Sequence, residues 1–199
     1  MNSSEIIASL GLREHPLEGG YFIETDRRPE EIASPFTTGE FDLLTMLPVM
    51  SELISLDKVL RPLATSIHYL LTYDQPNGAI HSNKSVTYHV LHQGRAEYTM
   101  IIPETPPKVE KKIMGNNISA GETRLLIVGS GVWKMSKLMD EELSYARTDE
   151  DKGKVNCLIT EVVIPGFTWE DHHIVTEVEL ANLFDRDEQE IKQLRAYIK

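Results

Sequence analysis

The chain has 199 residues, a net charge of −11 and a single cysteine, Cys157. This length suits one well-packed domain, and the excess of acidic residues argues against nucleic acid or an anionic membrane as a partner. One cysteine excludes an internal disulfide and a cysteine-based zinc site, and we interpret Cys157 as a buried apolar residue. The N-terminus lacks a basic, apolar leader and no apolar run reaches membrane-spanning length, so we expect a cytoplasmic protein.

Ser3 or Ser4 is expected to cap a short N-terminal helix that ends at Gly11. A Gly-Gly pair then predicts a turn, and residues 21–25 after it have the composition of a strand. Residues 26–62 have the least regular pattern. Their apolar runs predict a helical insertion near residues 40–60. So long a connection inside a domain is usually functional or disordered, and its apolar content favours a packed flap over a disordered loop.

Strand-like runs separated by Gly, Pro and Asn turns fill the middle of the chain. The expected strands are residues 65–73, 78–82, 86–92, 95–102, 108–114, 121–128, 132–135 and 155–164. We interpret the acidic run 138–154 as a solvated surface loop. A capping box at Thr176 and apolar residues at helical spacing predict two C-terminal helices, divided near Asp185. Together these elements predict a single all-β domain, a double-sheet jelly roll or barrel with its core at about residues 15–175 and a helical extension at 176–199.

Four of the seven histidines lie within residues 65–94, namely His68, His81, His89 and His92. Imidazoles in strand-forming sequence either line a cavity or lie on a solvated face. Because side chains alternate along a strand, His89 and His92 are expected on opposite faces. We interpret His68, His92 and the pair at residues 172–173 as surface or structural residues.

Several sequence blocks together resemble the Cupin-5 group of the cupin superfamily, a domain of unknown function. The blocks are His-Pro-Leu-Glu-Gly-Gly-Tyr-Phe-Ile-Glu-Thr (residues 15–25) and the segments 65–71, 81–94, 131–133 and 165–167. The resemblance spans about residues 10–175. It implies a jelly-roll β-barrel, a pocket in the mouth of the barrel and a homodimer.

The chain departs from this family at the positions of the metal ligands. Cupins generally hold a metal with two histidines and a glutamate from a first motif and a histidine from a second motif. By the resemblance, His81 occupies the first of these positions, Thr87 replaces the carboxylate, and Lys134 stands where the second motif has its ligand. An ammonium group would repel the cation, so we expect no metal and no other cofactor.

Strand alternation in a barrel directs His81, Asn83, Thr87, His89 and Lys134 to the interior. This set suits general acid–base chemistry. We predict a metal-independent cupin enzyme that performs proton transfer, as an isomerase, epimerase, cyclase or lyase, on a small carbonyl-containing metabolite. His81 would be the base or acid and His89 its partner, and Lys134 would stabilise a developing enolate.

The expected substrate-binding residues are Glu24, Tyr69, Asn83, Thr87 and Trp133. Glu18 shares a block with Glu24, and either could supply a carboxylate to the pocket. Structural alternatives stand beside these roles: Glu24 could pair with Arg27 or Arg28, Trp133 could belong to the core, and Lys134 could reach solvent at the rim.

Two other functions are compatible with the sequence. One is a non-catalytic small-molecule-binding or structural dimer, which apolar side chains plugging the pocket and solvent-exposed histidines would favour. The other is a metal-dependent oxygenase using His81 and His89, which the missing carboxylate disfavours.

Overall fold

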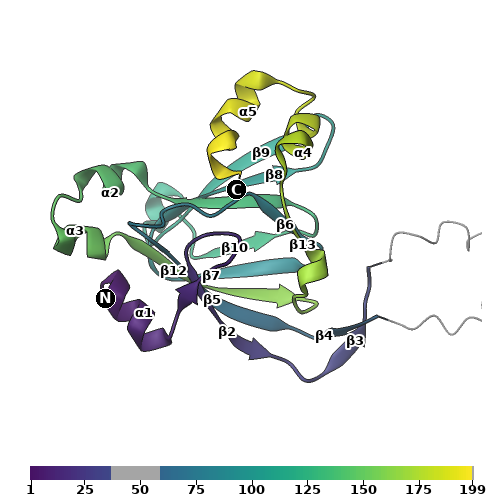
Figure 1. Cartoon of the computed structure of the whole chain (residues 1–199), viewed down its shortest axis with the longest axis horizontal. Helices are drawn as coiled ribbons and strands as arrows, with labels where there is room; N and C mark the ends of the chain where they lie inside the picture. Colours follow the sequence, from purple (N-terminus) through teal and green to yellow (C-terminus); the bar gives the residue numbers. More distant parts are fainter. Residues whose placement is uncertain (37–58, 199) are drawn as a thin grey trace, which may run out of the picture.

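A computed structural model describes residues 1–36 and 59–198, whose centre is two packed antiparallel sheets (Figure 1). The six-stranded sheet has the order β1 (Arg13–Glu14), β2 (Tyr21–Arg27), β5 (Thr65–Thr72), β12 (Asn156–Ile164), β7 (Val86–Gly94), β10 (Leu125–Val128). The five-stranded sheet has the order β13 (His172–Ile174), β6 (His81–Asn83), β11 (Trp133–Leu138), β8 (Ala96–Ile102), β9 (Lys108–Met114). The predicted all-β, double-sheet architecture is therefore confirmed.

A two-stranded arm, β3 (Glu31–Ala33) with β4 (Leu60–Pro62), lies on either side of residues 37–58. The helical insertion predicted near residues 40–60 falls on those residues, which lie outside the described part of the chain. Its last predicted residue, Leu60, begins a strand.

The N-terminal helix α1 (Ser3–Leu10) is capped by Asn2, not by Ser3 or Ser4 as the sequence suggested. The Asn2 side chain accepts a hydrogen bond from the Glu5 backbone N–H at 2.9 Å, and the Glu5 carboxylate accepts one from the Asn2 N–H at 3.0 Å. This reciprocal capping box satisfies two backbone donors at the helix start. Gly11 ends the helix in the left-handed conformation, as predicted.

The acidic run at 138–154 forms two short helices, α2 (Asp140–Tyr145) and α3 (Asp149–Lys154), so the predicted loop is wrong. Three acidic residues occupy the first turn of each helix, where they offset the positive end of the helix dipole. Thr148 and Asp151 add a capping box to the second. The acidic run is therefore exposed but helical.

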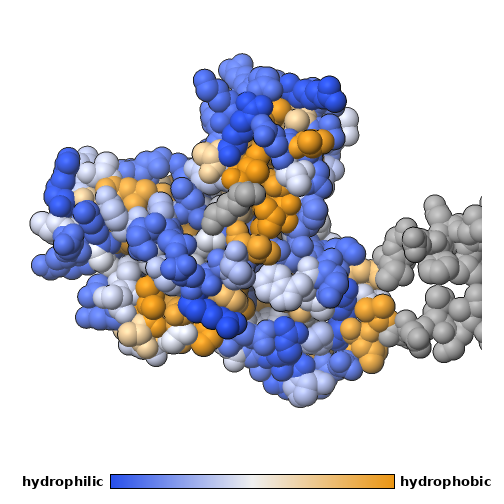
Figure 2. Space-filling model, viewed as in Figure 1, coloured by the Kyte–Doolittle hydropathy of each residue, from blue (hydrophilic) through white to orange (hydrophobic). Residues whose placement is uncertain are grey.

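The C-terminal helices α4 (Glu177–Leu183) and α5 (Glu188–Leu194) form as predicted, followed by the 3-10 turn η4 (Arg195–Tyr197). Thr176 provides the capping box, and Asp185 and Arg186 separate the helices with positive φ angles. Fully buried Leu180 and Ile191 pack with Ile80 and Ile101 against the five-stranded sheet. Figure 2 shows that hydrophobic residues also gather on the surface just below these helices. Among the described residues, no helix is long and apolar enough to cross a membrane.

The inward positions of β7, β11 and β12 change from apolar to polar along the strands. Leu91 and Ile159 belong to the core between the sheets, whereas His89, Lys134 and Glu161 carry polar groups inward. The strand register places Glu161 opposite His89. It also pairs β11 with β6, so that Lys134 lies opposite His81. One part of the interior is thereby a packed apolar core, and another is a polar pocket.

Gly20, in the loop that enters β2, packs closely against β5. It has a φ of +68°, and a Cβ there would lie 2.7 Å from the Leu70 carbonyl oxygen.

We expect Gly20→Ala to lower the free energy of unfolding by roughly 2–4 kcal/mol, measured by urea denaturation. Gly121→Ala is the matched control, because Gly121 has a φ of +85° with nothing within 4 Å of its Cβ position. Equal destabilisation by the two substitutions would contradict a role for close packing at Gly20.

Candidate active site

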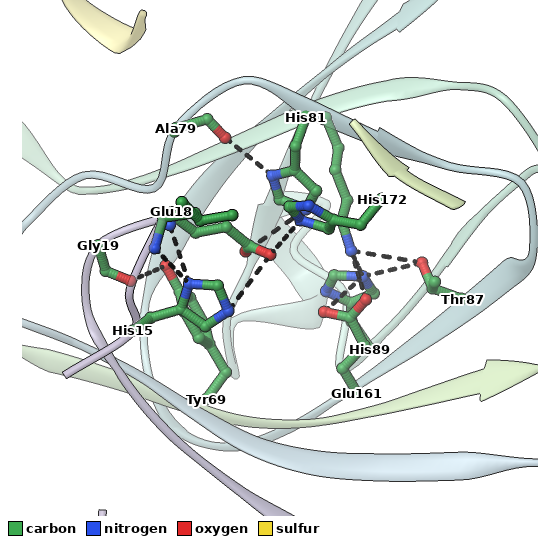
Figure 3. Close-up of polar contacts among 12 residues, drawn as sticks. His15, Glu18, Gly19, Tyr69, Ala79, His81, Thr87, His89, Glu161 and His172 are labelled. Atoms are coloured by element: carbon green, nitrogen blue, oxygen red, sulfur yellow. Dashed lines mark hydrogen bonds and ion pairs between the residues drawn. The ribbon is translucent and has the colours of Figure 1, made fainter. Parts of the chain in front are cut away.

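A pocket of about 210 Å³ opens between the two sheets. Side chains from β6, β11, β12 and β13 and from the loop before β2 line it. Its polar groups form two clusters, one around Lys134 and one around Glu18. In Figure 3, Thr87, His89 and Glu161 of the first cluster lie on one side, and Glu18 and His15 of the second lie on the other.

The Lys134 cluster consists of four buried or nearly buried side chains. The Lys134 Nζ donates to Glu161 Oε1 at 2.5 Å and to His89 Nε2 at 2.9 Å, and it lies 3.5 Å from Thr87 Oγ1. Burial alone would raise the pKa of Glu161, but the Lys134 ammonium, with a smaller effect of His89, lowers it to about 2. The carboxylate therefore stays ionised and compensates the buried cation.

His89 lies behind Lys134 and does not line the pocket. Because an ammonium group only donates, His89 Nε2 is the acceptor and Nδ1 carries the proton. Burial and the Lys134 ammonium lower the pKa of His89 to about 3, against a smaller opposing effect of Glu161. The neutral imidazole thus accepts a hydrogen bond from Lys134 on the side away from the pocket.

The second cluster is centred on the Glu18 carboxylate. Its Oε1 accepts from His172 Nε2 at 2.7 Å and lies 3.6 Å from His15 Nε2, while its Oε2 lies 3.4 Å from His81 Nε2. Burial alone would raise the pKa of Glu18, but His81, the hydrogen bond from His172 and the charge of His15 hold it well below the usual value. Glu18 is therefore an ionised carboxylate surrounded by three imidazoles.

The Nε2 atom of His81 lies near this carboxylate and carries no proton in the neutral ring. His81 Nδ1 donates to the Ala79 carbonyl oxygen at 2.9 Å, which fixes the proton on that nitrogen in the neutral ring. Burial lowers the pKa of His81 to about 4, although Glu18 opposes the shift, and Lys134 adds to it. At neutral pH, Nε2 of His81 is thus an unprotonated base beside a carboxylate that would stabilise its protonated form.

The loop over residues 15–20 is held in place by backbone and side-chain hydrogen bonds. His15 Nδ1 accepts from the Glu18 backbone N–H at 2.8 Å, and the Glu18 carbonyl accepts from the Ala79 N–H at 2.8 Å. The buried Tyr69 hydroxyl donates to the Gly19 carbonyl at 2.9 Å. These bonds fix the backbone from which the Glu18 side chain enters the pocket.

The positions at which cupins place metal ligands do not fit a metal here. Thr87 offers only a hydroxyl, and the Lys134 ammonium lies beside it. Glu18, His81 and His172 do bring three possible ligand atoms within 4.8 Å of one another. However, ligands on one ion at bonds of 2.0–2.2 Å lie roughly 3 Å or more apart, and His172 Nε2 is 2.7 Å from Glu18 Oε1, a hydrogen-bond distance.

The three predicted catalytic residues, His81, His89 and Lys134, lie close together. Of these, His81 and Lys134 line the pocket, whereas His89 does not. Among the predicted substrate-binding residues, Asn83 lines it, and Glu24 lies there in an ion pair with Arg27 at 2.6 Å.

The remaining three substrate-binding predictions need correction. Thr87 is buried behind Lys134, and Tyr69 is a core residue under the Glu18 loop. Trp133 packs with the C-terminal helices because it follows the opposite alternation from Lys134 on β11.

Sequence reasoning missed several polar residues of the site, among them His172 and Glu161. His172, interpreted as a surface or structural residue, lines the pocket, whereas its neighbour His173 is exposed and bonds Glu179 at 2.7 Å. Glu161 was not singled out. Its signal was present, because it alternates with buried Ile159 and Val163 in an apolar strand.

The two antiparallel sheets and the pocket between them define a cupin-type protein. The family described as Cupin superfamily (DUF985) matches residues 4–175, and the chain belongs to this family, which confirms the predicted resemblance. The chain is 36% identical over 169 residues to the uncharacterized protein YML079W of Saccharomyces cerevisiae. The aligned region covers 83% of this chain and 72% of the yeast protein.

Two solved structures share the fold over almost the whole chain. A hypothetical protein from Leishmania major has a TM-score of 0.72 at 23% identity, with 97% of this chain and 98% of that one covered. Protein SO0799 from Shewanella oneidensis has a TM-score of 0.69 at 20% identity, with 100% and 98% covered. At these identities the likeness establishes the fold alone.

The lowered pKa of His89 makes stability depend on pH. Folding favours the neutral ring, so its contribution is fully present above the unfolded pKa near 6.5 and is lost as pH falls toward the folded value of about 3. Between pH 7 and pH 5 we expect this residue to account for a loss of about 2 kcal/mol in the free energy of unfolding. Urea denaturation of His89→Gln at both pH values should show a correspondingly smaller loss than the unsubstituted protein.

The exposed His173 supplies the control, because His173→Gln should keep the full pH dependence. If His89→Gln and the unsubstituted protein lose the same stability between pH 7 and pH 5, the buried neutral state of His89 is contradicted.

Proposed function

We propose that this protein is a metal-independent cupin enzyme that transfers a proton on a small carbonyl-containing metabolite, as an isomerase, epimerase, cyclase or lyase. The observation that carries the proposal is the pairing of two groups in one pocket: the free Nε2 of His81 and the ammonium of Lys134. A base and a hydrogen-bond donor on either side of a small cavity suit abstraction of a proton next to a carbonyl.

In the proposed reaction, His81 Nε2 removes a proton from the carbon adjacent to the carbonyl. The electron pair of that C–H bond moves onto the carbonyl oxygen, and Lys134 Nζ stabilises the resulting enolate by a charged hydrogen bond. The Glu18 carboxylate, 3.4 Å away, stabilises the imidazolium that forms. Return of the proton to a different carbon or face completes an isomerisation or epimerisation, while expulsion of a β-substituent completes an elimination.

His89 and Glu161 serve as positioning residues for Lys134. Together they receive two of its three N–H bonds, and the third is directed to Thr87 Oγ1 at 3.5 Å, a contact long enough for a substrate oxygen to replace. His172 and His15 hold the Glu18 carboxylate in a similar way.

The non-catalytic alternative receives less support from the pocket. A plugged cavity and solvent-facing histidines would have favoured it, but His81 is 7% exposed and lines an open cavity of about 210 Å³. The oxygenase alternative would need a metal at a site where Lys134 supplies a positive charge.

Proton transfer can be measured without knowing the physiological substrate. We expect the protein to accelerate exchange of the C–H hydrogens next to the carbonyl of at least one compound among small 2-keto and 3-keto acids in D₂O, followed by proton NMR. His81→Gln and Lys134→Met should each lower that exchange by about 10²-fold or more, since each removes a group acting at the reacting atoms.

The control is His68→Gln, because His68 bonds Thr160 Oγ1 at 3.1 Å on the outer side of the sheet and takes no part in the pocket. Its exchange rate should equal that of the unsubstituted protein. Exchange no faster than in buffer for every compound tested, or stoichiometric tightly bound Fe, Ni, Mn or Zn in the purified protein, would refute the proposal.

For assembly we propose a homodimer that covers the outer face of β7 and β10. Leu125, Ile127 and Val90 are 50%, 52% and 39% exposed there, on and beside the edge strand of the six-stranded sheet. A second copy would bury these side chains and protect the open strand edge.

Light scattering should give twice the chain mass of 22.6 kDa, and Ile127→Asp should shift the protein toward the monomer. Val178→Asp, at a 69% exposed residue of α4, which packs on the other sheet, should leave the dimer intact. A monomeric unsubstituted protein at micromolar concentration would contradict the proposed assembly.

A further inference from the structure

Aromatic rings form one wall of the pocket. Phe22, Phe167 and Trp169 line it together with the imidazoles of His15 and His172. The rings are in mutual contact: their centroids are 4.5 Å apart for His15–Phe22, 5.1 Å for Phe167–Trp169 and 5.8 Å for Trp169–His172. Trp169 is nevertheless 50% exposed. A large ring that packs on other rings and still faces an opening is available to a ligand.

This aromatic wall is held in place by buried polar contacts. Trp169 begins a 3-10 turn, η3 (Trp169–Asp171), whose last residue forms an ion pair with Arg61 at 2.6 Å. Both partners are buried. The Phe167 backbone N–H donates to Thr65 Oγ1 at 2.9 Å. The wall is therefore built before any ligand arrives, and little ordering would accompany binding.

Cationic groups lie beside the aromatic wall. Arg13 and Arg27 line the same opening, and the Arg13 guanidinium carbon is 5.1 Å from the centroid of the Phe22 ring. Lys134 lines the pocket as well, but its charge is paired with Glu161, as that of Arg27 is with Glu24. Arg13 forms no ion pair among the described residues, so it is the cation that would repel a quaternary ammonium ligand and attract an acidic group beside the aromatic wall.

We propose that the ligand of this pocket is a planar, conjugated carbonyl compound with one acidic group. Its flat π system would lie against Trp169 and Phe167, and its carbonyl oxygen would face Lys134. The role of Lys134 rests on the proposed proton-transfer function, whereas the preference for a planar ligand rests on the aromatic wall. Edge-on and stacked ring contacts favour a flat partner over a saturated one of equal size by up to about tenfold in affinity.

Two carboxylates of equal carbon number and charge test this preference. trans-Cinnamate is planar and conjugated, whereas 3-cyclohexylpropanoate is saturated and puckered. By isothermal titration calorimetry we expect the unsubstituted protein to bind cinnamate about tenfold more tightly. Phenyltrimethylammonium, a cation with the same ring, should bind more weakly than cinnamate.

Variants at Trp169 connect the preference to the wall. Trp169→Ala should bring the ratio of the two carboxylate dissociation constants close to one, and Trp169→Phe should keep most of it. Tyr145→Ala is the control, because Tyr145 is a 78% exposed aromatic residue on α2 that does not line the pocket. It should leave the ratio unchanged.

Equal affinities for the two carboxylates, binding of neither, tighter binding of the cation, or an unchanged ratio in Trp169→Ala would each overturn this inference. Binding is measured here without turnover, so the result is separate from that of the proton-exchange assay. Selective cinnamate binding without any proton exchange would support the planar ligand and refute the proposed reaction.

Discussion

The ion pair between Lys134 and Glu161 is the interaction on which the pocket depends. An ammonium group buried between two sheets is costly unless an opposite charge and further hydrogen bonds compensate it, and Glu161 and His89 provide both. β7 and β12 are paired in the six-stranded sheet and carry His89 and Glu161, whereas β11 in the five-stranded sheet carries Lys134, so the packing of the two sheets sets the distances of the ion pair. A cation held so firmly in the interior also makes the position beside Thr87 a poor site for a metal ion.

Glu18 provides a carboxylate on the other side of the pocket, and it does so from a loop. The loop over residues 15–20 is tied to the barrel by the Tyr69 hydroxyl and by the Ala79 N–H, so its carboxylate enters the pocket without a strand to carry it. Three imidazoles surround this carboxylate, and one of them, His81, keeps a free nitrogen. The pocket thus has a stabilised cation on one side and a stabilised anion with a neutral base on the other. Such an arrangement can separate and recombine a proton without a metal.

Much of this could be predicted from the sequence, because period-two alternation and turn residues depend on neighbours in the chain. The main strands and the C-terminal helices follow from such local patterns, whereas the convergence of His81, His89 and Lys134 was implied by the resemblance to the family's motifs. The contribution of His172 could not be predicted, since it depends on β13 pairing with β6 across the sheet. Glu161 and Trp133 were predictable from alternation: Glu161 shares the face of buried Ile159 and Val163, and Trp133 must point away from the face that Lys134 occupies.

The proposed proton transfer requires a neutral His81 with its proton on Nδ1 and an unprotonated Nε2. Two-dimensional ¹⁵N NMR of histidine-labelled protein reads the tautomer and the charge of each imidazole directly. We expect the neutral Nδ1–H form of His81 at pH 7, persisting to about pH 5, in line with a pKa of about 4. A proton on Nε2, or titration of His81 at its ordinary pKa near 6.5 or above, would contradict the proposed proton transfer.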